Sequence, residues 1–312
     1  MMSIINFKIG STINVSTHIR IGTRGSKLAL AQANLVKQLL QEKESQSDIE
    51  IVTIESEGDQ DQSTPLSELG GKGVFIKAIE AALMCEEVDI AVHSLKDVTT
   101  ELAVGSQLAA YLPAESVADT LCLAPQLNTI QSIETLPLNA VVATGSLRRK
   151  AQLLHYRPDV SIVPIRGNID TRLKKLANKE VDAIMLSEAG LIRLNYQQDY
   201  NVVLNPITFI PAPGQGVIVV QARMGDPRLP FIQSINHHHQ AQVSELELAI
   251  VRQLGFDCQY PLGLYAQYQS DHFLLSAFNA HPKTLEGRYL TATIPLDYTA
   301  ADLDEVIIDL IE

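Results

Sequence analysis

A Lys-Asp pair closes one of the apolar runs in this sequence. In "VDIAVHSLKDV" the run from Val88 to Val92 is followed by polar side chains that include Lys96 and Asp97. In a parallel α/β sheet such a run is buried on both faces, and ligands bind at the carboxyl ends of the strands. The local sequence leaves two interpretations open. One is a buried ion pair or a helix cap, and the other is a carboxylate that balances positive charge in a ligand site.

Three other turns combine small, hydroxyl and basic residues between a predicted strand and a predicted helix: "IGTRGSKLAL", "ATGSLRRKAQ" and "IRGNIDTRL". A helix N-terminus offers unpaired N–H groups and the positive end of the helix dipole, and Arg matches carboxylates and phosphates. Each turn alone is also compatible with N-capping beside surface arginines. With Arg193 further along, the turns together predict one converging anion site. Its candidate residues are Arg24, Ser26, Thr144, Ser146, Arg148, Arg149, Arg166, Gly167, Asn168 and Arg172.

Two further motifs have a simpler interpretation. "GGKGVF" lacks the spacing of a phosphate-binding P-loop, and we interpret it as a loop that presents Lys72 and Phe75. The triple histidine at 237–239 lies in a polar segment, where a solvated helix start is favoured over a metal site, so no metal is expected. Cys85 and Cys122 have apolar neighbours and are predicted to be core residues.

Composition excludes several classes of protein. The 312-residue chain has a net charge of −12, which argues against general affinity for nucleic acid. Residues 144–193 nevertheless hold ten Lys or Arg against five Asp or Glu, as expected of a local anion site. No apolar run approaches the roughly 20 residues that span a bilayer. The start shows no secretory h-region, and three cysteines fit a reducing compartment, so we expect a cytoplasmic protein without a membrane partner.

The predicted elements alternate between strand and helix, which is typical of βαβ units and mostly parallel sheets. Two such series are separated by "AAYLPAESVAD", and the strand after "PAPGQG" is predicted to return to the first series. We therefore expect two α/β lobes joined by two crossings, the first comprising 18–112 and 217–234 and the second 118–210. Residues 239–312 alternate like antiparallel strands and end in a helix, which predicts a small α+β domain.

The order of these motifs resembles that of the porphobilinogen deaminase (hydroxymethylbilane synthase) family. "RIGTRGSKLALAQA", "GGKGVF", "DIAVHSLKDV", "ATGSLRRKAQL", "IRGNIDTRL", "PAPGQG" and "DCQYPLGLYA" all take part, so the likeness covers roughly residues 18 to 270. It implies lobes like those of periplasmic solute-binding proteins. It also implies a transferase of porphyrin and haem biosynthesis that polymerises four porphobilinogens head to tail, with loss of ammonia, to give hydroxymethylbilane.

The resemblance assigns a role to each motif. It implies a covalent dipyrromethane cofactor attached through Cys258 and a catalytic carboxylate at Asp97, which stabilises the cation left when ammonia departs. Lys96 and Gln215 complete the surroundings of Asp97. The basic and hydroxyl residues of the anion turns, with Lys72, pair with the acetate and propionate groups of the substrate. The implied partner is porphobilinogen, and we expect a monomer.

Four residues depart from the family pattern. Phe256 and Asp257 stand before Cys258, where the family commonly has Gly-Gly, and Glu68 and Asp170 add negative charge near a site for a polyanion. An adjacent Asp disfavours the thiolate form of a cysteine. The alternative interpretation is a non-catalytic, two-lobed anion-binding protein, which would need the anion turns but neither Asp97 nor Cys258.

Overall fold

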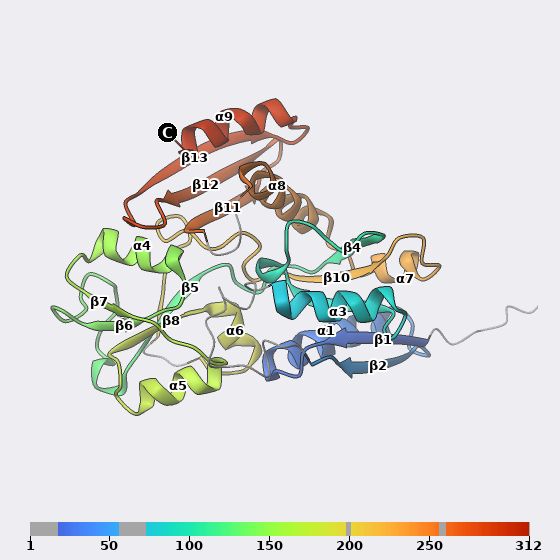
Figure 1. Cartoon of the computed structure of the whole chain (residues 1–312), viewed down its shortest axis with the longest axis horizontal. Coiled ribbons are helices and arrows are strands. Elements are labelled where there is room, and N and C mark those ends of the chain that lie inside the picture. The colour runs from blue at the N-terminus through green and yellow to red at the C-terminus, as the bar shows by residue number, and fades with distance from the viewer. Residues whose placement is uncertain (1–17, 56–72, 198–200, 256–259, 312) are drawn as a thin grey trace, which may run out of the picture.

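The computed structural model describes residues 18–55, 73–197, 201–255 and 260–311, except the side chains of residues 73–75. This part of the chain forms two α/β lobes and a smaller third unit, which lies above the two lobes in Figure 1. The predicted fold class is therefore confirmed: two lobes with mixed, mostly parallel sheets and a small α+β unit at the C-terminal end.

The first lobe has a five-stranded sheet with the order β2-β1-β3-β10-β4. Its strands are β1 (His18–Thr23), β2 (Asp48–Thr53), β3 (Ile90–Ser94), β4 (Ser106–Tyr111) and β10 (Ile218–Arg223). Its helices are α1 (Lys27–Lys43), α3 (Gly73–Met84), the 3-10 helix η1 (Leu95–Asp97) and α7 (Leu229–Gln233). Side chains alternate across a strand, so Ile90 and Val92 pack with residues of α1, whereas Ala91 packs with residues of α3. Burial on both faces explains the nearly continuous apolar run of β3.

The second lobe repeats this plan with the strand order β7-β6-β8-β5-β9. Its strands are β5 (Asp119–Leu123), β6 (Val141–Ala143), β7 (Ser161–Val163), β8 (Ala183–Ser187) and β9 (Val202–Val203). Its helices are α4 (Leu147–Tyr156), α5 (Ile169–Ala177), α6 (Glu188–Arg193) and the 3-10 helix η2 (Pro125–Leu127). Two clusters of buried apolar side chains, one containing Met185 and the other Ile184, lie on its two faces.

Each sheet holds one antiparallel strand, and it is fourth in the order in both lobes: β10 in the first and β5 in the second. These are the strands that the chain enters after it crosses between the lobes. The strand after "PAPGQG" pairs with β3 and β4, so it returns to the first lobe as predicted. The boundaries 18–112 with 217–234, 118–210 and 239–312 remain a proposal, because strand pairing does not define where a domain ends.

The third unit is a three-stranded antiparallel sheet with two long helices packed against it. Its elements are α8 (His238–Leu254), β11 (Leu262–Tyr268), β12 (His272–Ala280), β13 (Gly287–Pro295) and α9 (Ala300–Ile311). The triple histidine begins α8: His237 is the N-cap, its Nδ1 accepts a hydrogen bond from the Gln240 N–H at 3.1 Å, and all three histidines are exposed. The predicted solvated helix start is thus confirmed.

One of the two core predictions for cysteine is wrong. Cys122 lies on β5 and is 1% exposed, and burial raises the pKa of its thiol to about 12. Cys85 is exposed, because α3 ends at Met84 and the helix face that packs on the sheet is made by Ala82 and Leu83. Among the described residues, no helix is both long and apolar enough to cross a membrane.

Candidate active site

The turns singled out in the sequence follow the carboxyl ends of parallel strands. β1 and β3 run parallel in the first lobe, and β6 runs parallel to β7 and β8 in the second. The turn with Arg24 and Ser26 follows β1, and the turn with Lys96 and Asp97 follows β3. The remaining arginine turns follow β6 and β7, and Arg193 ends the helix after β8. Parallel strands thus bring each set of predicted residues to one edge of its sheet.

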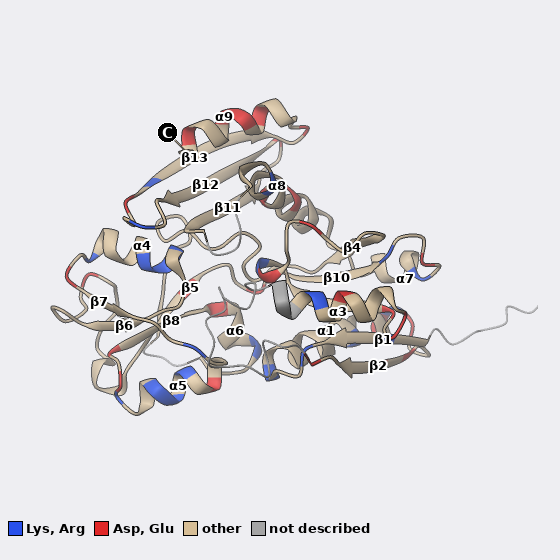
Figure 2. Cartoon of the chain, viewed as in Figure 1, with Lys and Arg blue, Asp and Glu red and all other residues tan. Residues whose placement is uncertain are grey.

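The two edges meet across the lobes. Lys27, at the start of α1, lies 3.0 Å from an Asp170 carboxylate oxygen in the first turn of α5, and the Tyr196 hydroxyl donates to the same oxygen at 2.6 Å. The hydrogen bonds to Tyr196 and Lys27 hold the pKa of Asp170 below its ordinary value. Asp170, a departure from the family pattern, is therefore one half of an ion pair between the lobes. Figure 2 shows that α4 and α5, in the second lobe, carry Lys and Arg.

Three of the predicted residues are helix N-caps. Ser26 Oγ accepts from the Ala29 N–H at 3.3 Å, Ser146 Oγ from the Arg149 N–H at 3.4 Å, and Asn168 Oδ1 from the Thr171 N–H at 2.9 Å. The capping interpretation is correct for these side chains. It does not exclude anion binding by the two serines, because a hydroxyl that accepts a bond can still donate one. Thr144 Oγ1 accepts from the Ser146 N–H at 3.2 Å, which fixes the turn before α4.

A single buried carboxylate holds both arginines of "SLRRK". Asp119, the first residue of β5, is 0% exposed, and Arg148 and Arg149 are 4% and 8% exposed. Arg148 Nη1 donates to Asp119 Oδ2 at 2.7 Å, while Arg149 donates to Oδ1 from Nε at 3.0 Å and from Nη2 at 2.7 Å. Arg148 and Arg149 also donate to the backbone carbonyls of Ile210 and Met185.

The electrostatics of this cluster leave a surplus of positive charge. Burial alone would raise the pKa of Asp119, yet the charges of Arg148 and Arg149 hold the pKa of this carboxyl well below its usual range. One carboxylate thus faces two guanidinium groups. Burial lowers the pKa of Arg172, and the nearby charge of Arg149 lowers it further. Arg149 and Arg172 therefore repel each other, and an anion bound between them would be stabilised by both charges.

Gln215, from the "PAPGQG" loop, joins this cluster to the Lys-Asp turn. Its Nε2 donates to Asp119 Oδ1 at 2.9 Å and to the Val117 carbonyl at 2.8 Å, while its Oε1 accepts from Lys96 Nζ at 3.3 Å. It is 2% exposed. The structure therefore connects Lys96, on the edge of the first lobe, with Asp119, in the second.

Two further arginines lie half-buried at the edges. Arg172 Nε donates to the Gly167 carbonyl at 2.8 Å, and Arg193 Nη2 donates across the lobes to the Gly216 carbonyl at 2.6 Å. Arg193 Nε is buried and has no hydrogen-bond partner among the described residues. Burial lowers the pKa of Arg193, and the negative charge of Glu115 offsets part of this effect. A buried guanidinium N–H without a partner in the protein is expected where a bound anion accepts that hydrogen bond.

Asp97 lies in η1, directly after β3, and its side chain is half-buried. Burial lowers the pKa of the neighbouring His93 to about 4, against the effects of the Gln221 hydrogen bond and the Asp97 charge, so His93 is neutral near pH 7. Arg24 and Arg166 are also half-buried. Arg24 lies in the turn after β1, and Arg166 lies in the turn after β7. Like Lys96 and Asp97, both take part in polar interactions within the protein.

Several predicted residues fall outside this description. Lys72 and Cys258 lie outside the described residues, as do the departures Glu68, Phe256 and Asp257. The loop interpretation is wrong for Phe75, which belongs to the first turn of α3; its side chain is not among those described.

Asp119 was not singled out from the sequence. The signal was present, because "ADTLCL" places an aspartate at the start of an apolar strand, where a buried charge requires a partner. Its partners lie 29 and 30 residues away, and a sequence does not show which arginine meets which carboxylate.

The comparisons with known proteins agree with one another. A sequence model described as "Porphobilinogen deaminase, dipyromethane cofactor binding domain" matches residues 19–230. A porphobilinogen deaminase of Maridesulfovibrio salexigens is 40% identical over 263 residues, which is 84% of this chain and 84% of the relative. A porphobilinogen deaminase of Rickettsia prowazekii is 45% identical over 253 residues, covering 80% of this chain and 83% of the relative.

Among solved structures, an ancestral cationic amino acid solute-binding protein is similar to this chain with a TM-score of 0.42 and 15% identity. The likeness covers 74% of this chain and 93% of that structure.

Proposed function

Because the chain belongs to the porphobilinogen deaminase family, we propose that it joins four porphobilinogen molecules head to tail, with release of ammonia, to form hydroxymethylbilane for tetrapyrrole biosynthesis. The observation that carries this proposal is the family match over residues 19–230, which spans both lobes. The chain is thus a transferase, and the alternative of a non-catalytic anion-binding protein is not favoured.

The charge distribution of the site supports this chemistry. Porphobilinogen carries an acetate and a propionate, so substrate and product are polyanions. We assign to their carboxylates the arginines and hydroxyls at the two sheet edges, among which Arg172 and Arg193 have the clearest capacity for another anion. Arg149 adds positive charge beside Arg172, although its own hydrogen bonds go to Asp119 and Met185. Arg148 is nearly fully buried, and we assign it a role in holding the turn rather than in touching the substrate.

The residues present also fit the dipyrromethane cofactor that the family implies, because this group carries several carboxylates and the edges offer several guanidinium donors. When bound, the dipyrromethane supplies the pyrrole carbon to which the first substrate is joined. Arg172 and Arg193, with the hydroxyls of Ser26 and Ser146, would hold its carboxylates, and Arg149 adds positive charge beside Arg172. We propose attachment through the thiol of Cys258.

Asp97 is the proposed catalytic residue. When the C–N bond of the substrate aminomethyl group breaks, its electron pair leaves with ammonia and the remaining pyrrole carries a positive charge. A carboxylate beside the pyrrole N–H stabilises that charge more in the transition state than in the ground state. Lys96, fixed by Gln215, holds the turn that presents Asp97.

The proposal has a direct test. The purified chain is incubated with porphobilinogen, and the release of ammonia and the appearance of hydroxymethylbilane are measured. We expect both products in the ratio of four ammonia molecules to one bilane. A chain that binds porphobilinogen but releases no ammonia would contradict the proposal.

We also propose that the enzyme acts as a cytoplasmic monomer without nucleic acid. The net charge of −12 supports the absence of nucleic-acid binding. Sedimentation of the purified chain would test whether it is a monomer. A salt titration with a polynucleotide would test the absence of nucleic-acid binding.

A further inference from the structure

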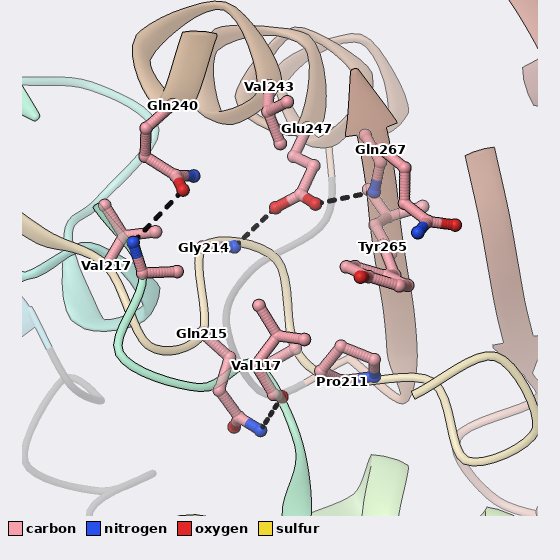
Figure 3. A pocket seen from close by; sticks show the side chains of 14 residues that line it. Val117, Pro211, Gly214, Gln215, Val217, Gln240, Val243, Glu247, Tyr265 and Gln267 are labelled. Carbon is pink, nitrogen blue, oxygen red and sulfur yellow. Dashed lines mark hydrogen bonds between the residues drawn. The ribbon is translucent and has the colours of Figure 1, made fainter. Parts of the chain in front are cut away.

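A cavity of about 240 Å³ lies where the third unit meets the two crossings. Its walls come from the crossing segment at 114–117, the loop 211–217, α8 and β11, as Figure 3 shows. Of the residues proposed for the active site, Gln215 alone lines this cavity. The ionisable side chains in its lining are Glu247 and Tyr265, and every other lining side chain is apolar or an amide.

Glu247 ties the loop to the third unit. Its side chain projects from α8, where Oε2 accepts from the Gly214 N–H at 2.7 Å and Oε1 accepts from the Ala266 N–H of β11 at 2.9 Å. Both bonds are drawn in Figure 3. Glu247 is 5% exposed and forms no ion pair with the described residues. Burial raises the pKa of its carboxyl to about 7, although the two N–H groups lower it.

The loop held by Glu247 has little room to move. Gly214 has φ +68° and Gly216 has φ +86°, a region that favours glycine. A Cβ placed on Gly214 would lie 2.6 Å from Leu95 Cγ, and one on Gly216 would overlap the Ser116 carbonyl. Leu95 directly precedes Lys96 and Asp97, so a shift of Gly214 presses on the turn that carries the proposed catalytic carboxylate.

The residue between these two glycines is Gln215, which connects the loop to both halves of the active site. Its side chain holds Lys96 on one side and Asp119 on the other. Asp119 in turn holds Arg148 and Arg149. A displacement of the backbone at Gly214 therefore reaches both the Lys-Asp turn and the arginine turn through hydrogen bonds and direct packing.

We propose that Glu247 is a positioning residue for bilane synthesis: by binding the Gly214 and Ala266 N–H groups together, its carboxylate fixes the loop 211–217 against the third unit and so sets the place of Gln215, Lys96 and Asp97. This inference rests on the proposed function. Glu247 touches no reacting atom, and its effect passes through the loop.

The ionised form of Glu247 is the form that binds both N–H groups. A carboxylate accepts hydrogen bonds from both N–H groups. A protonated carboxyl carries a hydrogen on one oxygen, so that oxygen becomes a donor and binds its N–H group less well. With a pKa of about 7, Glu247 is protonated in an increasing share of molecules as the pH falls from 8 to 6. Tyr265 does not share this range, because burial and the Glu247 charge raise the pKa of its phenol above the ordinary value.

The test compares Glu247→Gln with Glu245→Gln, which changes an exposed carboxylate two residues away on the same helix. The amide that the first substitution introduces can accept from only one of the two N–H groups. Steady-state rates with porphobilinogen are measured for both variants and the wild-type chain between pH 6 and 8, after cofactor content has been equalised by intact mass. Bilane formation by the wild-type chain establishes the proposed function separately from this inference.

We expect Glu247→Gln to lower kcat about ten- to a hundredfold at pH 8, the effect of a small misplacement of catalytic groups, with less than a threefold change in KM. We also expect the wild-type chain and Glu245→Gln to lose kcat as the pH falls through about 7, a limb that Glu247→Gln lacks. A Glu247→Gln variant with wild-type kcat, or with the same limb, would overturn the proposal.

A second measurement keeps the proposal testable if Glu247→Gln does not fold. Hydrogen exchange of the wild-type chain, corrected for the intrinsic pH dependence, is followed at the amides of Gly214 and Ala266. We expect their protection to change between pH 6 and 8 over the same pH range as kcat. Protection that stays constant while kcat changes would overturn the proposal.

Discussion

Asp119→Asn is the substitution from which we expect the largest loss of stability at the turn before α4, which carries Arg148 and Arg149. The change removes one negative charge and keeps the size of the side chain. The amide can still accept from one arginine, but its NH₂ group faces the donors of the other arginine and of Gln215. Arg148 and Arg149 then remain buried, at 4% and 8% exposure, without a charge of opposite sign.

The magnitude follows from the burial of this cluster. Removal of one partner from a buried ion pair costs about 3–5 kcal/mol, because the remaining charge is left uncompensated. Here the carboxylate serves two arginines with three hydrogen bonds, so we place the loss in free energy of unfolding within that range. Whole proteins are stable by about 5–15 kcal/mol, and the variant is therefore expected to fold with a much smaller margin.

Urea unfolding followed by circular dichroism is a suitable assay, since the chain has no tryptophan to report by fluorescence. Asp159→Asn is the matched control, because Asp159 pairs with Arg157 in a less buried setting, with the two side chains 24% and 12% exposed. We expect the midpoint of Asp119→Asn to fall by at least about 1 M urea at pH 7, for a slope of about 3 kcal/mol per M. The control should change much less. Equal losses in the two variants would refute the reasoning that burial makes the Asp119 pair costly to break.

Three other predictions follow from the same geometry. Asp97→Asn should keep the wild-type circular dichroism spectrum and thermal midpoint but lose at least about 99% of its turnover, the usual scale for removing one electrostatic stabiliser; near-normal bilane formation would contradict the catalytic role. Asp170→Ala, which removes the partner of Lys27 between the lobes, should increase hydrogen exchange at the start of α1 at low salt, and unchanged exchange would show that this ion pair does not hold the lobes. For Glu247 the folded pKa lies above the unfolded value of about 4.3, so the native state binds the proton more tightly and stability is lost as the pH rises from about 4 through 7. In urea unfolding, the wild-type chain should therefore lose about 3 kcal/mol relative to Glu247→Gln over that range, and a constant difference between them would show that Glu247 does not titrate there.

The parts of this protein that depend on local pattern were predictable from its sequence. The period of apolar residues predicted β3 and α1, and the "PAPGQG" loop marked the return of β10 to the first lobe. The placement of the anion turns also followed, because parallel strands bring their carboxyl ends to one edge. In "ATGSLRRKAQ", however, the capping role of Ser146 and a role in anion binding depend on the same residue types, so local sequence alone did not separate them.

Features that depend on contacts between distant residues were not predictable. Asp119 meets its arginines only because β5 runs antiparallel beside β8, and Glu247 meets Gly214 only because α8 packs on the loop. Cys85 has apolar neighbours in the sequence yet lies exposed, since the end of α3 leaves it past the packed face. The sequence left open whether Asp170 weakens substrate contacts or points to solvent, and the structure shows it paired with Lys27, 143 residues away.

The central claim is that the chain builds bilane on a covalent cofactor at Cys258, and peptide mass mapping tests this most directly. The purified chain is incubated with porphobilinogen, digested, and the peptides containing Cys85, Cys122 and Cys258 are weighed. We predict an added mass of about two pyrrole units on the Cys258 peptide and unmodified peptides for the other two cysteines. An unmodified Cys258 peptide, or the added mass on Cys85 or Cys122, would contradict the account.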